Sequence, residues 1–446
     1  MSATTSRWSR VLVAVGIVAL VAWQAAVLVD LPRRTAVTLG VYGFVLHVVF
    51  GKAYALVPSY FDRDLAWSVA PAVQLPLTTV GVAGLALTPL TGVPDIAGAI
   101  GAVTWTLGVA VFLGTLLATV RTNLTGAETG TGEHNADRRP VDRAANLFVP
   151  LVLAYLAVGT WETLAMQTAA PGLFDGYPPR VSHLLAAGTA ALLVFAVGFR
   201  LLPRFLVTQV ERPLPWVVLL PGAVGPALIA VGLPGGSLLH AGAGLEAVAM
   251  LGWAFVYVRL YRATDRGRVG FYGPLAGVAA GVLGVGLGVL MAVQSVSRPL
   301  AIAHYRLNVL GFLGLTIVGV TYQFYPPTVG RFPGAGDRLA LGSMALLGGG
   351  LGVEVAGALA SFPTVTVVGR AVSLVGVGAG VGVGCEGFGS VTFGGLTETF
   401  ASGSVVFSRG TETLASGSET FAHSIIQAVI RRSSPMVKPY SSAWDG

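Results

Sequence analysis

About twelve apolar stretches follow one another along this chain, each long enough to cross a bilayer. The hydrocarbon core is about 30 Å thick and an α-helix rises about 1.5 Å per residue, so a crossing helix needs about 20 apolar residues. Lipid offers no hydrogen-bond partners to the backbone, and stretches of this length therefore indicate helices. The predicted helices run near 10–31, 36–61, 67–90, 95–120, 144–167, 181–206, 214–234, 238–263, 271–294, 300–327, 337–360 and 366–386.

The composition agrees with lipid as the main solvent of the chain. Only 11% of the residues are charged and 54% are hydrophobic, whereas a soluble domain carries about 25% charged residues. The single cysteine, Cys385, cannot form an internal disulfide, which excludes a disulfide-stapled fold. We therefore predict an all-α integral membrane protein with a polytopic transmembrane domain over residues 1–386.

The segment 387–446 differs from the rest in composition. Ser, Thr, Gly and Glu replace Val, Leu and Ala, and residues 397–404 return almost unchanged at 411–418. Such biased sequence supplies few side chains for a packed core, so we expect a poorly ordered C-terminal tail. A functional tail and an abnormal C-terminus, such as a shifted reading frame, both explain the change.

Arginine is distributed unevenly between the two predicted faces of the membrane. Cytoplasmic loops collect Lys and Arg, so we predict a multi-pass protein of the plasma membrane with both termini cytoplasmic. The net charge of +7 then reflects arginines beside anionic lipid headgroups, and no nucleic-acid partner is expected. The side of the termini holds Arg7, Arg10, Arg63, Arg121, Arg138, Arg139, Arg143, Arg200, Arg204, Arg212, Arg259, Arg262, Arg266, Arg268, Arg331 and Arg338, against Arg33, Arg34, Arg180 and Arg298 on the other.

Histidine placement indicates an internal repeat. His47, His183 and His304 lie in the second, sixth and tenth predicted helices, which are the second members of three successive groups of four. In each of these helices glycine follows the histidine and a proline lies near the inner end. We therefore predict three pseudo-repeated groups of four helices. The prolines are Pro58, Pro203 and Pro326.

This pattern resembles subunit I of the haem-copper oxidase superfamily, including its nitric oxide reductase relatives. In that family a haem-ligand histidine on helix 2 precedes a proline by eleven positions, as His47 precedes Pro58 here. Helix 10 of the family carries His-x-His, then glycines, then an aromatic residue and proline. The chain has His304-Tyr305-Arg306, then Gly311, Gly319 and Phe324-Tyr325-Pro326. The NnrS family, twelve-helix membrane proteins with haem and copper that act in nitric oxide tolerance, is similar in the same helices.

The resemblance implies a haem cofactor held by histidine. His47 would be an axial ligand of a low-spin haem and His304 the proximal ligand of a high-spin haem, with His183 as a further candidate. Arg306 stands where the family has its second helix 10 histidine. It would hold a haem propionate or, alternatively, pair with a carboxylate on a neighbouring helix. Copper is not expected, because helix 6 offers only His183 and the chain has no His-His pair.

The same residues also allow purely structural explanations. An imidazole in hydrocarbon needs a partner, which for His47 is either haem iron or a polar residue on another helix. His183 and His240 lie near helix starts, where interfacial hydrogen bonds can satisfy them. Lys52 and Glu246 could belong to a proton path or to an ion pair.

The leading prediction for function is a haem-binding membrane protein. It would carry electrons or act on nitric oxide or oxygen, as an oxidoreductase of the cytochrome oxidase or nitric oxide reductase type without a complete haem-copper centre. A small gaseous ligand and a redox partner subunit are the partners it implies, besides the lipid bilayer. The alternative is a twelve-helix transporter or channel without a redox cofactor. Such transporters usually consist of two related halves, whereas the histidines here indicate three groups.

Overall fold

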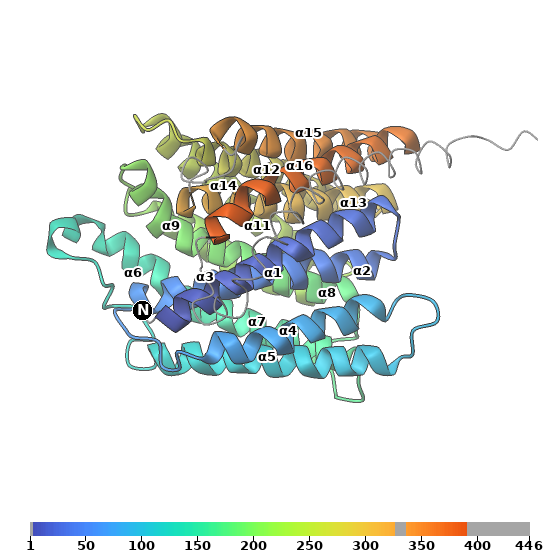
Figure 1. Cartoon of the computed structure of the whole chain (residues 1–446), viewed down its shortest axis with the longest axis horizontal. Helices are drawn as coiled ribbons and strands as arrows, with labels where there is room; N and C mark the ends of the chain where they lie inside the picture. Colours follow the sequence, from blue (N-terminus) through green and yellow to red (C-terminus); the bar gives the residue numbers. More distant parts are fainter. Residues whose placement is uncertain (1–2, 326–335, 390–446) are drawn as a thin grey trace, which may run out of the picture. The chain divides into compact units, whose positions relative to one another are not determined.

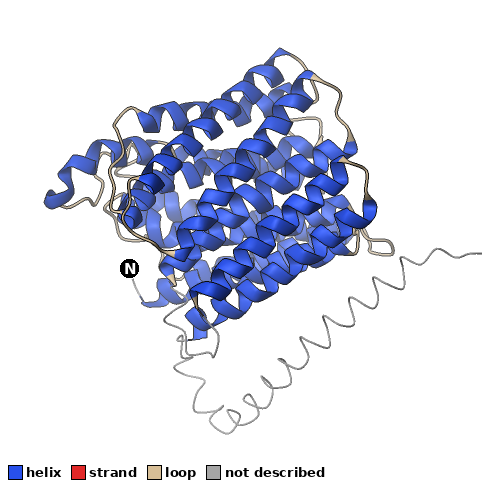
Figure 2. Cartoon of the chain, turned by 90° about the horizontal axis from the view of Figure 1, so that it is seen from above, coloured by secondary structure: helices blue, strands red, loops and turns tan. Residues whose placement is uncertain are grey.

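The computed structural model describes residues 3–325 and 336–389, with side chains as far as residue 380, and is helical throughout these ranges, with no strand in them. Figures 1 and 2 show the helices packed side by side with their axes roughly aligned. Twelve helical spans in the described residues are long and apolar enough to cross a membrane, which confirms the predicted fold class. We number them spans 1 to 12 in chain order.

Most of the spans are single helices whose last residues lie within a few residues of the predicted ends. Span 12 continues past its predicted end at 386, and the predicted tail lies outside the described residues from residue 390 onward. These single helices are α1 (Ala3–Leu28), α4 (Ala70–Leu87), α5 (Ile96–Val120), α10 (Leu214–Gly232), α11 (Ser237–Arg262), α15 (Asp337–Leu359) and α16 (Pro363–Gly389).

Two further spans begin with a short 3₁₀ segment. Span 5 contains η2 (Glu133–Arg138), α6 (Arg139–Leu147) and α7 (Val149–Ala165), and span 9 contains η4 (Val269–Phe271) and α12 (Tyr272–Val293). The segment between the predicted helices 95–120 and 144–167 is therefore partly helical. The chain turns between α6 and α7 at Phe148, just before Pro150, whose missing N–H is tolerated in the first turn of a helix.

Spans 2, 6 and 10 share a feature that hydropathy alone does not indicate. Each contains a π-helical segment, in which backbone hydrogen bonds join residues five apart and the turn is wider than in an α-helix. The three spans are α2 (Arg33–Val37), η1 (Thr38–Leu46) and α3 (His47–Tyr60); α8 (Pro178–His183), η3 (Leu184–Ala191) and α9 (Leu192–Leu206); and α13 (Arg298–Arg306), η5 (Leu307–Gly314) and α14 (Leu315–Phe324).

The π segments set a common register for the three groups. Each segment ends twelve residues before the inner proline, as the numbering of Leu46 and Pro58, of Ala191 and Pro203, and of Gly314 and Pro326 shows. A glycine lies three residues before each segment's end, and an aromatic residue lies four residues before each proline. These are Gly43, Gly188 and Gly311, and Tyr54, Phe199 and Tyr322. The predicted threefold repeat is therefore visible in backbone geometry as well as in sequence.

The histidines do not occupy equivalent positions within this repeat. His47 is the first residue after η1, whereas His183 is the last residue before η3 and His304 lies three residues before η5. The sequence pattern placed one histidine in each second helix, and that much holds. In the common register His47 lies nine residues closer to the proline than His183 and eleven closer than His304, which is about two and a half to three helical turns deeper in the membrane.

Spans 2, 6 and 10 lie at the centre of the helical unit. They are the spans with the largest buried share, and η1, η3 and η5 contact one another. The third and fourth spans of each group form close pairs around them, α4 with α5, α10 with α11, and α15 with α16. Because lipid gives no hydrophobic force between helices, such pairs depend on small residues that let backbones approach. A Cβ on Gly81 would lie 2.7 Å from the backbone nitrogen of Trp105.

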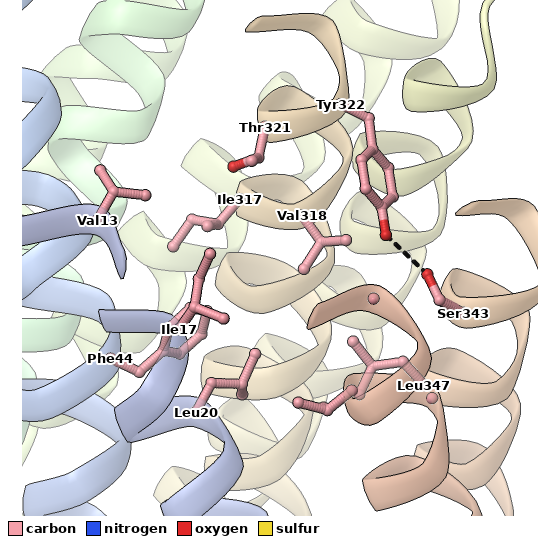
Figure 3. Close-up of a pocket in the computed structure, with 13 residues that line it drawn as sticks. Val13, Ile17, Leu20, Phe44, Ile317, Val318, Thr321, Tyr322, Ser343 and Leu347 are labelled. Carbon is pink, nitrogen blue, oxygen red and sulfur yellow. Dashed lines mark hydrogen bonds between the residues drawn. The ribbon is translucent and has the colours of Figure 1, made fainter. Parts of the chain in front are cut away.

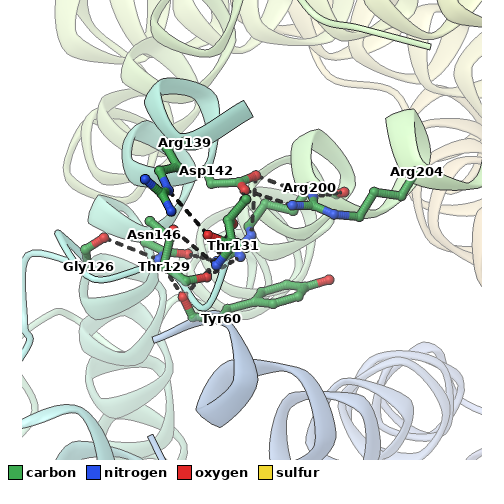
Figure 4. A network of polar contacts seen from close by, with 9 residues as sticks. All are labelled: Tyr60, Gly126, Thr129, Thr131, Arg139, Asp142, Asn146, Arg200 and Arg204. Atoms are coloured by element: carbon green, nitrogen blue, oxygen red, sulfur yellow. Dashed lines mark hydrogen bonds and ion pairs between the residues drawn. The ribbon is translucent and has the colours of Figure 1, made fainter. Parts of the chain in front are cut away.

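A buried polar network joins spans 2, 5 and 6 to the loop before span 5 (Figure 4). Arg200 of α9 donates from Nη1 to Tyr60 O at 2.7 Å and to Asn146 Oδ1 at 2.6 Å, and from Nη2 to Thr129 O at 2.7 Å. Its guanidinium carbon lies 4.0 Å from the centre of the Tyr60 ring. One buried cation thus binds two backbone carbonyls and one side-chain carbonyl from three separate segments.

Asp142 of α6 supplies the negative charge of this network. It lies 3.5 Å from Arg200 Nε and 2.7 Å from Arg204 Nη2, and it accepts a hydrogen bond from Thr131 Oγ1 at 2.5 Å. Asp142 is buried, so its charge is stabilised by these partners and not by water. The network explains why the segment around Thr129 and Thr131 is held against the spans.

The close pairing of α4 with α5 generates the first prediction. Gly81→Val places two methyl groups against the backbone of α5, which cannot move aside as a flexible side chain can, so we expect a loss of about 3 kcal/mol or more. The measurement is the thermal unfolding midpoint of the purified protein in detergent. The matched control is Gly114→Val on α5, where nothing lies within 4 Å of the new Cβ. Equal effects of the two substitutions would contradict this packing.

Candidate functional site

His47 sits at the start of α3 and is fully buried. Its Nδ1 lies 2.8 Å from the carbonyl oxygen of Tyr42, inside the π-helical segment η1. The ring packs against Trp105 of span 4 and Phe50, with centroid separations of 6.3 and 6.1 Å. Its Nε2 has no hydrogen-bond partner among the described residues. The partner of Nδ1 is thus the backbone of the same span, and the described residues supply no polar side chain from another helix to His47.

His183 and His304 face each other across spans 6 and 10. Their ring centroids are 6.0 Å apart and the planes differ by 26°. His304 Nδ1 lies 2.8 Å from Gly284 O of span 9, and His183 Nδ1 lies 2.7 Å from Pro179 O. The structure therefore brings together two of the candidate ligands, both in the first helical segment of their spans.

The loop before span 6 holds the start of α8, and with it His183, in place. Arg180 Nε lies 2.9 Å from Asp175 Oδ1, and Arg180 Nη1 donates to the backbone oxygens of Ala230 and Val231 at the end of span 7. The hydrogen bond from Arg180 holds the pKa of the Asp175 carboxyl below its usual value. The Arg180 side chain thus joins the start of span 6 to the end of span 7.

His47, His183 and His304 share one hydrogen-bonding arrangement. In each, Nδ1 donates to a backbone carbonyl, because a carbonyl can only accept, and this leaves the lone pair on Nε2. Metal-ligating histidines are usually held in this way by their second nitrogen. Among the described residues no three His, Cys, Asp or Glu side chains gather in a group that could hold a metal ion.

The two residues predicted as metal ligands face different helices. His47 packs on span 4, whereas His304 packs on His183 of span 6 and lies beside Gly288 of span 9. They therefore contribute to two separate places in the helical unit. The partner of His304 is the third candidate, His183.

Arg306 pairs with a carboxylate on a neighbouring helix, which was the alternative to a role at a haem propionate. Its Nε and Nη2 lie 3.0 and 2.7 Å from Glu354 Oε2 on α15, and Nη2 also donates to Gln24 Oε1 on α1 at 2.8 Å. Arg370 of α16 approaches the other Glu354 oxygen at 3.2 Å. Positions two apart on a helix are rotated by about 200°, which explains why Arg306 and His304 reach different neighbours. Sequence reasoning missed Gln24 and Arg370, because nothing local marks them as partners of residue 306.

An apolar cavity of about 40 Å³ lies among spans 1, 2, 10, 11 and 12 (Figure 3). Its polar margin is Tyr322, whose hydroxyl lies 2.9 Å from Ser343 Oγ. Its other walls include Ile17, Leu20, Phe44, Ile317 and Leu347, and no candidate histidine lines it. A dry cavity of this size suits a small apolar molecule and not a porphyrin.

The remaining polar candidates, Lys52, Glu246 and His240, have different surroundings. Lys52 Nζ lies 3.9 Å from the centre of the Phe324 ring and 4.8 Å from that of Tyr325, a cation–π arrangement. Glu246 Oε1 is buried without a hydrogen-bond partner, and neither Lys52 nor Glu246 belongs to an ion pair found within the described ranges. The ion pair suggested for them is therefore not formed there. His240 Nε2 bonds to Ala292 O at 2.8 Å, as expected for an interfacial histidine.

Comparison with known proteins adds no family assignment. A scan against protein-family models gave no match, and a search of curated proteins gave none either.

The buried Arg306–Glu354 pair generates the second prediction. Glu354→Leu alone leaves two guanidinium groups without their shared carboxylate, so we expect a loss of about 3–5 kcal/mol in the free energy of unfolding. The double variant Glu354→Leu with Arg306→Met removes both buried charges and should recover much of that loss. Thermal or chemical unfolding in detergent measures both. A double variant no more stable than Glu354→Leu would mean that Arg306 is stabilised mainly by other groups.

Proposed function

We propose that the protein binds haem within the membrane, with His304 and His183 as the residues that hold it. The observation that supports this is the facing pair of imidazoles, each oriented through Nδ1 by a backbone carbonyl and each left with a lone pair on Nε2. The donor set fits iron, because neutral imidazole nitrogen is a common axial ligand. The haem would supply a redox-active iron able to bind a small gaseous ligand.

The protein's own contribution is orientation and exclusion of water. The carbonyl of Gly284 holds the ring plane of His304, and the carbonyl of Pro179 holds that of His183. Asn308 Nδ2 donates to His304 O at 2.8 Å, which stiffens the turn that follows His304. Both histidines are half-buried in apolar spans. Electron transfer or a redox role toward nitric oxide or oxygen is the function that this arrangement favours, with a redox partner subunit as electron donor.

His47 is the second candidate ligand. Its unpartnered, buried Nε2 is what an iron ligand needs, yet Phe50 and Trp105 pack closely around the ring. Arg306 is occupied by Glu354 and Gln24, so a role toward a haem propionate would fall to its remaining nitrogen, Nη1. His304 with His183 therefore remains the stronger proposal.

The alternative is a transporter without a redox cofactor, and the experiment must distinguish it from a haem-binding protein. The repeat of π segments divides the chain into three groups of four spans, whereas twelve-span transporters usually consist of two related halves. This difference favours the haem proposal.

The third prediction is spectroscopic. Protein expressed with added haem and purified in detergent should show a Soret band that shifts on reduction with dithionite, and His304→Ala should remove most of it. His183→Ala should shift or weaken the band. The control is His240→Ala, since that exposed ring bonds at the helix end. An absent band in the parent protein would leave the transporter alternative, and loss only in His47→Ala would place the iron on span 2.

We also propose that the protein resides in the plasma membrane with both termini cytoplasmic. The arginine-rich ends of the spans include the network around Arg200, and cytoplasmic loops are the ones that collect arginine. The even-numbered spans would then run from outside to inside.

The fourth prediction tests this orientation. In a Cys385→Ser background, Thr125→Cys lies in the loop after span 4 and Thr91→Cys in the loop after span 3, and both positions are exposed. An impermeant maleimide added to intact cells should label the cysteine at 91 and leave the cysteine at 125 unlabelled until the cells are opened. Labelling in the opposite order would reverse the proposed topology.

A further inference from the structure

The outer ends of spans 1 and 10 gather three buried N–H donors that lack an acceptor. Trp23 Nε1, Gln24 Nε2 and Arg306 Nη1 have no hydrogen-bond partner among the described residues, and all three side chains are almost wholly buried. Arg306 Nη2 donates to Gln24 Oε1 at 2.8 Å, and the guanidinium carbon lies 5.0 Å from the centre of the Trp23 ring. The side chains that carry the three donors therefore form one cluster.

The missing partner of this cluster must accept hydrogen bonds. An indole N–H and a guanidinium can only donate, and the carbonyl oxygen of Gln24 is already used by Arg306. A buried donor left unpaired in a membrane is strongly unfavourable, because neither water nor lipid replaces the lost bond. The chemistry of the three groups thus points to an enclosed acceptor and excludes a cation.

Charge favours an anion over a water molecule as this acceptor. Arg306 and Arg370 share one buried carboxylate, Glu354, while Asp30 is exposed and lies 3.4 Å from Arg370 Nη1. Arg33 adds positive charge at the same end, close enough to act electrostatically on Tyr305. Counted by one rule, the positive side chains Arg306, Arg370 and Arg33 exceed the negative side chains Glu354 and Asp30 by one. Buried charges are normally compensated, which a neutral water cannot do.

We infer that Trp23, Gln24 and Arg306 enclose a small monovalent anion of the halide class, which holds the outer ends of spans 1, 10 and 11 together. The three donor atoms are sealed from solvent, so their acceptor is compact and lacks a bulky substituent. The site is separate from the His183–His304 pair, since Arg306 and His304 reach different helices.

The experiment is a chloride titration of thermal unfolding. Full-length protein in detergent is unfolded at constant ionic strength while sodium gluconate is replaced by sodium chloride, and circular dichroism records the melting temperature. A ligand that binds only the folded state raises this temperature in a saturable way, and bromide should act like chloride. A parent protein whose melting temperature is the same in gluconate and chloride would overturn the inference and leave water as the acceptor.

Two variants sharpen the test. Gln24→Glu places a carboxylate inside the cluster in place of the anion, so the variant should melt above the parent in gluconate and no longer respond to chloride. Trp23→Phe removes one donor and keeps an aromatic ring. The chloride concentration that gives half of the maximal rise in melting temperature should therefore increase at least several-fold. The control is Gln74→Glu at a buried glutamine of span 3, which should melt lower and keep the chloride response. Parent-like chloride responses in both cluster variants would place any anion elsewhere.

Discussion

Every polar group that enters the hydrocarbon must find its partner within the protein, and the structure follows this constraint at each level. The backbone satisfies it with helices. Ionisable side chains satisfy it across helices: Glu354 with Arg306, and Asp142 with Arg200. His47 Nε2 and Arg306 Nη1 depart from this rule among the described residues. The proposal of an anion begins from such a departure, whereas the proposal of haem begins from the facing rings of His183 and His304.

Sequence reasoning succeeded where a property is carried by consecutive residues. The positions of the twelve spans follow from runs of apolar side chains, and the grouping into three follows from the recurrence of glycine and proline around His47, His183 and His304. The number of residues per span sets the crossing length directly. This part of the fold needs no knowledge of tertiary contacts.

Sequence reasoning was weaker where partners lie far apart in the chain. Nothing near residue 306 indicates that its carboxylate lies on span 11, and nothing near His304 indicates that His183 is its neighbour. The π segments were missed because one extra residue in a turn leaves hydropathy unchanged. The different depths of the three histidines were missed for the same reason, since the common register becomes visible only once the ends of the π segments are known.

The π segments also change how the three central spans can evolve. A π segment is equivalent to one residue inserted into an α-helix, so everything beyond it is turned by about 100° relative to an uninterrupted helix. In span 2, for instance, the side chains of α2, before η1, and those of α3, after it, point in directions that differ by this rotation. Deleting one residue from such a segment would turn the inner half of the helix as a unit, moving lipid-facing positions into the centre. Each central span therefore behaves as two half-helices whose sequences are free to diverge separately, provided that the inserted residue is kept.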